Sequence, residues 1–226
     1  VTLRIDEVKN LVTARNITAD LQGDYPWTEA NPLLLTNVKV EALGGKITMQ
    51  QLRMPQHDPA LLRVDNISSS ELISAVNPKQ FAMSGPVSGA LPFWLDNEKW
   101  IIKDGWLTNP GPMTLRIDQD TADAIVKDNV VAGAAINWLR YMEISQSWTK
   151  LNVDNLGVLT MQAAIKGTSR VEGKSSFVNL NYTHEENIFT LWRSLRFGDN
   201  LQTWFEQHAA IPLLRGSTGK ESEEQQ

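Results

Sequence analysis

The chain has 226 residues and a mass of 25.3 kDa, enough for one large or two small domains with a sizeable core. Its 21 Lys and Arg against 26 Asp and Glu give a net charge of −5, which disfavours nucleic-acid binding. The lack of Cys excludes disulfides and thiolate metal sites, and no apolar run approaches the roughly 18 residues of a membrane span. Because the chain begins Val1-Thr2-Leu3 without Met or a leader, we expect a mature or excised piece.

The first part of the chain alternates apolar and polar residues with a period of two, which predicts half-buried strands. The alternation covers residues 17–22 and 38–42 and returns at 47–54. Gly44-Gly45 separates the last two segments and predicts a hairpin. Within 47–54 the apolar residues change parity at Gln50-Gln51, which predicts a β-bulge.

A short helix and a second hairpin are predicted next. Ser68, followed by Glu71 three residues later, forms a capping-box pattern at the start of the helix. Asp96-Asn97 separates strands at 91–95 and 100–102. Four prolines in or beside short strands predict that those strands lie at edges or ends of the sheet: Pro86, Pro92, Pro110 and Pro112.

The longest predicted helix starts after Asp118 or Asp120 and runs to about Met142, where apolar residues recur at helical spacing. Two further alternating segments, 159–165 and 178–182, then predict strands with one apolar face.

The end of the chain predicts two more helices. A capping box at Thr183 and Glu186 precedes an amphipathic helix over 188–195, and Asp199 caps a helix over 201–208. The segment 215–226 has no apolar residue, so we expect one domain over 1–214 followed by a disordered polar tail.

These patterns together predict a mainly β fold: a curved, twisted antiparallel sheet, either an open gutter with an apolar concave face or a closed sandwich, with two or three end-capping helices. If the apolar face is open, it forms a groove. The residues expected to line it are Val38, Val40, Ile47, Met49, Leu62, Val64, Trp100, Ile102, Leu159, Met161, Ile165, Val178, Leu180 and Tyr182.

No motif predicts catalysis, a metal site or a cofactor. His184-Glu185-Glu186 lacks the second His of the zinc-protease motif, because Ile188 stands in its place. Ser88 stands in the wrong position for a nucleophile elbow. The helix residues Trp192, Arg193 and Arg196 predict either a headgroup contact or an end-cap helix packed on the sheet.

Several compound motifs resemble a known family. They include Leu43-Gly44-Gly45-Lys46 with Leu52-Arg53-Met54-Pro55, the sequence Trp100 to Gly105, and His184-Glu185-Glu186-Asn187 with Leu191-Trp192-Arg193. Together these motifs resemble the carboxy-terminal part of YdbH-like proteins. That family belongs to the AsmA-like group of Gram-negative envelope proteins, with TamB and YhdP, and this region carries an older "dicarboxylate transport" domain label.

The resemblance implies the distal end of a long protein that is anchored in the inner membrane and spans the periplasm. It implies phospholipid as cargo, moved between the inner and outer membranes along the apolar face. It also implies a small outer-membrane lipoprotein as partner, and strands 158–165 and 178–182 lack the prolines that would block docking by β-strand addition. The alternative is a non-catalytic β-sandwich interaction domain of an envelope protein.

Overall fold

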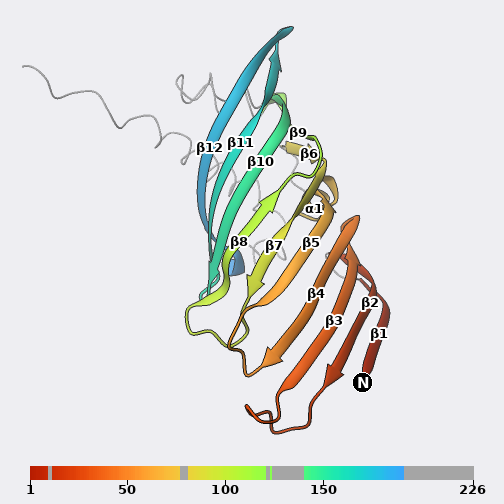
Figure 1. The fold of residues 1–226 in the computed structure, drawn as a ribbon. Coiled ribbons are helices and arrows are strands. Elements are labelled where there is room, and N and C mark those ends of the chain that lie inside the picture. Colours follow the sequence, from red (N-terminus) through yellow and green to blue (C-terminus); the bar gives the residue numbers. More distant parts are fainter. Residues whose placement is uncertain (10–11, 77–80, 121–122, 124–139, 191–226) are drawn as a thin grey trace, which may run out of the picture.

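In the computed structural model the described residues are 1–9, 12–76, 81–120, 123 and 140–190 (Figure 1). Within them, one antiparallel sheet contains all the strands, which curve and twist along their length. In chain order the elements are β1 (Thr2–Lys9), β2 (Thr13–Gln22), β3 (Leu33–Ala42), β4 (Gly45–Met54), β5 (Ala60–Ser68), α1 (Ser69–Val76), β6 (Phe81–Ser84), β7 (Pro86–Phe93), β8 (Trp100–Thr108), β9 (Met113–Ile117), β10 (Tyr141–Asp154), β11 (Val158–Val171) and β12 (Lys174–Asn187).

The main path of the sheet follows the chain closely, in the order β1-β2-β3-β4-β5-β7-β8-β10-β11-β12. The short strands β6 and β9 pair with each other beside this path, and β9 also pairs with β10. Because β1 and β12 stand at the two ends, the sheet is open and not a barrel. The predicted mainly β, antiparallel gutter is confirmed, and no second sheet that would make a sandwich occurs in the described part of the chain.

Four strands contain an Asn or Asp with positive φ, a conformation that these residues adopt more readily than other non-glycine residues. They are Asn16 in β2, Asn37 in β3, Asn66 in β5 and Asp104 in β8. The pairing register skips at or beside each of them. Such bulges bend a strand and increase its local twist, so these residues supply curvature to the sheet.

The predicted parity change at Gln50-Gln51 is present in β4, and the neighbouring strand β3 changes parity at the same level. Met49 and Leu52, three residues apart, pack in the same apolar cluster. The β3–β4 register is nevertheless constant on both sides, because β3 changes parity opposite Gln50, at Asn37. The irregularity therefore lies in both strands, and the two remain in step.

The predicted short helix is confirmed as α1. The backbone N–H of Glu71 donates to the Ser68 hydroxyl at 3.3 Å, as the capping pattern requires. The predicted helix ending near Met142 is wrong at its end, because Met142 lies in β10, pairs with Leu115 and Ser169, and is 1% exposed. Its central part, 124–139, lies outside the described residues.

The predicted capping box at Thr183 and Glu186 is wrong, because both residues belong to β12. The cap is instead Asn187, whose side-chain oxygen accepts from the backbone N–H of Thr190 at 2.9 Å. A helical turn then covers 188–190. The rest of that predicted helix, the helix over 201–208 and the tail 215–226 lie outside the described residues.

The prediction that these prolines mark edge or end strands is wrong, because β7 lies between β5 and β8, β8 lies between β7 and β10, and β9 pairs with both β6 and β10. Pro86 opens β7, and Pro110 and Pro112 lie between β8 and β9. Pro92 lies inside β7, a central strand between β5 and β8. It is tolerated there because the β7–β8 register is interrupted between Ala90 and Phe93, so that the missing N–H falls in a gap of the ladder.

Candidate functional site: the apolar face of the sheet

A row of cross-strand neighbours crosses eight strands on one face of the sheet. Directly opposed residues share a face, and here each partner is opposed in turn by a residue of the next strand. With about 4.8 Å between strands, the seven steps span roughly 34 Å. The row consists of Val40, Ile47, Val64, Gly89, Leu107, Thr149, Ala163 and Tyr182, from β3 to β12.

A second row of opposed residues lies beside the first on the same face, two residues further along each strand. On β8 this row contains a glycine, over which two leucine side chains meet. Val38, Met49, Leu62 and Leu91 are opposed in sequence from β3 to β7. On β8 the row reaches Gly105, where an added Cβ would stand 3.0 Å from Leu91 Cδ2 and 3.1 Å from Leu151 Cδ1. The two leucines therefore meet over the glycine, and the row continues to Met161. We call the two rows together the apolar lane.

Two apolar clusters border the lane at opposite ends of the strands. One is built on Met49, Leu52 and Ala60. The other contains Met113, Met142, Ile144 and Val178, with Ile165 and Leu180 packed against it. The lane therefore joins two well-packed regions into one continuous apolar face.

The structure brings thirteen of the fourteen predicted groove residues onto this face. Trp100 departs from the set, because it pairs with Asp154 while Ile102 pairs with Val153, a register shift of one residue. Its ring lies under the ammonium groups of Lys99 and Lys103, at 5.2 and 4.5 Å. Trp100 is thus a cation–π partner. The helix residues Trp192, Arg193 and Arg196 lie outside the described residues.

Sequence reasoning missed the polar end of the lane on β12. The apolar alternation of Leu180 and Tyr182 continues in register to His184 and Glu186, which oppose Met161 and Leu159. Their side chains are only 17% and 12% exposed. The period-two pattern already placed them on this face, but the polar residue types suggested a helix cap and a failed metal motif instead.

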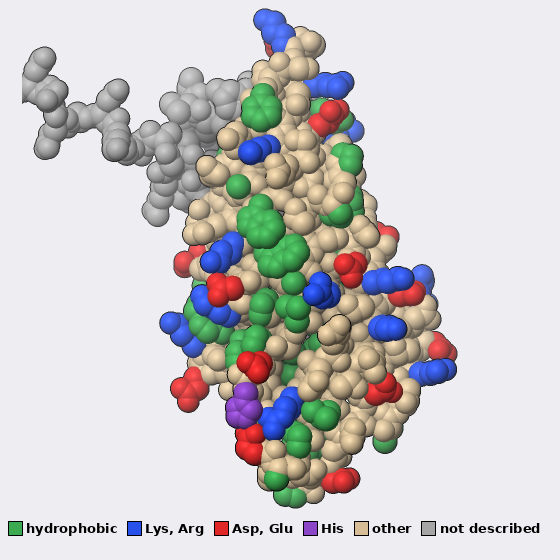
Figure 2. Space-filling model, viewed as in Figure 1, with side chains coloured by type: hydrophobic (Ala, Val, Ile, Leu, Met, Phe, Trp, Pro, Cys, Tyr) green, Lys and Arg blue, Asp and Glu red, His purple; other side chains and the backbone are tan. Residues whose placement is uncertain are grey.

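The opposite face is polar and carries an aromatic pair. Figure 2 shows one face of the molecule, on which a patch of hydrophobic side chains is surrounded by polar and charged ones. Trp106 and Trp148 alternate with lane residues and so lie on the face opposite the lane, with rings stacked at 5.1 Å and 11°. Asp104 pairs nearby with Lys103 and Lys150. The two faces thus differ strongly in polarity.

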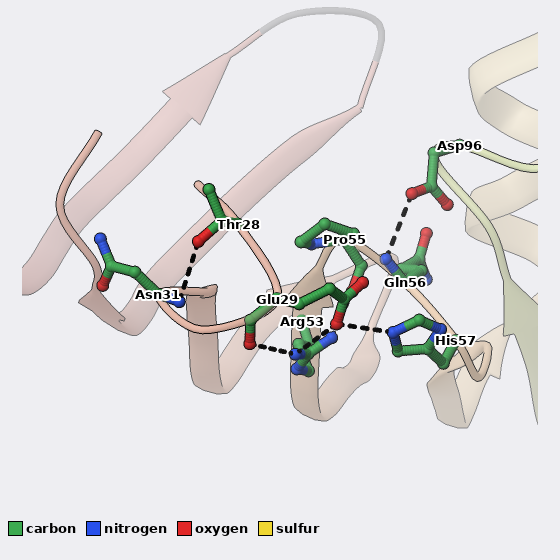
Figure 3. Close-up of polar contacts among 8 residues, drawn as sticks. All are labelled: Thr28, Glu29, Asn31, Arg53, Pro55, Gln56, His57 and Asp96. Carbon is green, nitrogen blue, oxygen red and sulfur yellow. Dashed lines mark hydrogen bonds and ion pairs between the residues drawn. The ribbon is translucent and has the colours of Figure 1, made fainter. Parts of the chain in front are cut away.

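Three loops are tied together at one rim of the sheet (Figure 3). The Glu29 carboxylate accepts from Arg53 at 3.0 Å and contacts His57 Nε2 at 2.8 Å. These hydrogen bonds, that of His57 first, lower the pKa of Glu29. Gln56 joins the neighbouring loop, with its backbone N–H donating to Asp96 at 3.2 Å. The cluster fixes the loops that end the strands.

Two hollows are lined mainly by polar residues, and the second also touches Met161 of the lane. One of about 730 Å³ surrounds the Gly44-Gly45 turn, and one of about 380 Å³ lies beside Lys150 and Glu185. Among the described residues, no group of three or more His, Asp or Glu is arranged to hold a metal ion. The helices in that part of the chain include none long and apolar enough to span a membrane.

The fold and its lane define a class: an open, one-sided antiparallel sheet whose apolar face suits an extended apolar ligand. The sequence model of the YdbH-like family, described as intermembrane phospholipid transport protein YdbH, matches residues 1–210, and the chain belongs to this family. The chain is 76% identical over its whole length to the "Probable phospholipid transport protein YdbH" of Escherichia coli (strain K12). It covers 26% of that relative. No solved structure matches the chain significantly.

Proposed function

We propose that this chain is the distal, carboxy-terminal module of a periplasm-spanning bridge that conducts phospholipid between the inner and outer membranes. The names of the family and of the Escherichia coli relative support phospholipid as the cargo. The full-length protein is then anchored in the inner membrane of a Gram-negative envelope, and this module is non-catalytic.

The observation that carries the proposal is the unbroken apolar lane across eight strands of an open sheet. An acyl chain of about sixteen carbons, at ~0.8 kcal/mol per CH₂, costs roughly 13 kcal/mol to expose to water. Transfer through an aqueous compartment therefore requires contact with apolar surface along the whole path. The lane runs across the strands and not along them. Each strand added to the edge of the sheet therefore lengthens the lane.

The partner proposed at the distal end is a small outer-membrane lipoprotein that docks by β-strand addition. Among the described strands, β12 ends the main path and has a neighbour on one side only, whereas β11 is paired on both sides. β12 contains no proline, so its outer edge accepts a foreign strand. Docking there extends the sheet and its apolar face toward the outer membrane.

Charge placed on the lane tests the proposal. We expect Met161→Asp in the full-length protein to lower phospholipid capture by a photoreactive residue at Leu180 several-fold, because an unpaired carboxylate on an apolar path is costly to contact. Val64 lies on β5, five strands from β12 along the main path and on the β1 side of Met161. Capture at Val64 therefore reports the lane before the block and should persist.

Gln162→Asp is the matched control, since Gln162 is adjacent in β11 but exposed on the other face. It should leave capture at both positions unchanged. A folded Met161→Asp protein that still delivers phospholipid normally to Leu180 contradicts the lane. Loss of the fold in Met161→Asp would show that the face is a closed core, in which a buried unpaired charge is not tolerated.

A further inference from the structure

The apolar lane changes character along β12. Val178 and Leu180 are apolar and pack in a core cluster. The next three positions on the same face are Tyr182, His184 and Glu186, opposite Ala163, Met161 and Leu159 of β11. An apolar surface therefore adjoins a cluster of three polar groups, which we call the Tyr-His-Glu cluster.

The cluster is partly connected internally. The Tyr182 hydroxyl lies 3.0 Å from His184 Nδ1, and the two rings stack with centroids 5.8 Å apart and planes at 15°. Burial raises the pKa of the Tyr182 hydroxyl, which therefore keeps its proton. In a neutral imidazole this hydroxyl donates to Nδ1, which places the ring proton on Nε2, facing Glu186.

The far side of the cluster has unused hydrogen-bonding capacity. His184 Nε2 lies 3.9 Å from Glu186 Oε2, which is beyond the 2.7–3.2 Å of a protein hydrogen bond. No Lys or Arg of the described residues pairs with Glu186, although its side chain is only 12% exposed. A half-buried donor and a half-buried carboxylate so placed each favour a further partner.

From this geometry we propose that the Tyr-His-Glu cluster binds the headgroup of an ethanolamine phospholipid. The primary ammonium of the headgroup donates to the Glu186 carboxylate, and a phosphate oxygen accepts from His184 Nε2. The acyl chains lie on the adjoining apolar surface around Leu180. This inference rests on the proposed function and adds the headgroup class that the distal end selects.

A headgroup without a cation cannot satisfy Glu186, so the site discriminates by charge. Phosphatidylethanolamine offers an ammonium, whereas phosphatidylglycerol offers only hydroxyls and leaves the carboxylate without a counter-charge. Hydrogen bonds to charged groups are strong enough for about tenfold discrimination or more.

The test loads the full-length protein in mild detergent from vesicles containing equal amounts of phosphatidylethanolamine and phosphatidylglycerol, and quantifies the bound lipids by mass spectrometry. We expect the wild type to be enriched in phosphatidylethanolamine. Glu186→Gln should reduce this enrichment about tenfold, and its retained phosphatidylglycerol shows that it is folded. Glu185→Gln is the matched control, because Glu185 is the next residue along β12 and points to the other face.

An unchanged lipid ratio in Glu186→Gln, or an equal loss in Glu185→Gln, overturns the headgroup assignment. Equal binding of both lipids by the wild type overturns it too, while leaving the proposed function intact. A wild-type protein that binds no phospholipid overturns both. Soluble phosphoethanolamine, which has the headgroup but no acyl chains, tests whether the acyl chains contribute to binding. Release of the bound lipid by this compound at matched concentration overturns that contribution, and no release supports it.

Discussion

The crossing of the lane over Gly105 is open to a quantitative test by a double-mutant cycle. Leu151 is 8% exposed, and its Cδ1 lies 3.1 Å from where a Cβ at position 105 would stand. Shortening Leu151 opens space at that point, and adding a methyl at Gly105 fills the same space. If the two residues share one packing site, the free-energy changes of unfolding for the two substitutions are not additive.

The magnitudes follow from the atoms removed and added. Leu151→Ala removes about three buried carbons at ~0.8 kcal/mol each and leaves a partial cavity, so it should cost about 3 kcal/mol. Gly105→Ala places a methyl within 3.0–3.1 Å of three side-chain carbons and should cost about 1 kcal/mol by overpacking. The double variant should be more stable than the sum of the two predicts, by about 0.5–1 kcal/mol.

The assay is urea unfolding followed by circular dichroism, with equal slopes required for the comparison. Gly111→Ala serves as the control partner, since a Cβ at Gly111 would meet Pro86 at 3.4 Å and does not approach Leu151. Its combination with Leu151→Ala should be additive. Additivity in the Gly105 cycle as well would refute the reasoning that the leucines close over this glycine.

Two further predictions concern the bends and the rim. Asn66→Val should destabilise by about 1–2 kcal/mol because φ is 52° at this position, whereas Asn66→Gly should be close to neutral; thermal unfolding of both variants measures the difference. The lowered pKa of Glu29, caused by His57 and Arg53, contributes stability that is present above its ordinary value of 4.5 and is lost as pH falls through the lowered value. Glu29→Gln should therefore flatten the decline of the melting temperature below about pH 4.5, and an unchanged acid profile would contradict this.

The sequence predicted the strands and their faces well, because a period of two assigns each side chain to a face without knowledge of the partner strand. The hairpin at Gly44-Gly45 and the helix start at Ser68 followed from turn and cap chemistry of the same local kind. The pattern of apolar and polar residues does not show where the backbone takes a positive φ and the pairing register shifts. Asp104 has φ of 57° and shifts the register of β8, and Trp100 pairs one residue out of step with Ile102.

The polar end of the lane was missed for a different reason. His184 and Glu186 follow Tyr182 at the correct spacing, so parity alone places them on the lane. A capping pattern competed with this parity, and only the pairing of β11 with β12 up to Asn187 decides between a strand and a helix. Local signals of similar strength are resolved by long-range pairing, which a single sequence does not contain.

The two ends of the described sheet differ in a way that gives the lane a direction. At β1 the side chains of Leu3 and Ile5 oppose Ala19 and Ile17, and they remain 47% and 36% exposed. This end presents apolar surface beside an unpaired edge, as a sheet that continues through a further strand would do. At β12 the same face ends in the half-buried Tyr-His-Glu cluster. Under the proposed function, an acyl chain meets a uniform apolar surface at β1 and a polar stop at β12, where the proposed headgroup site lies.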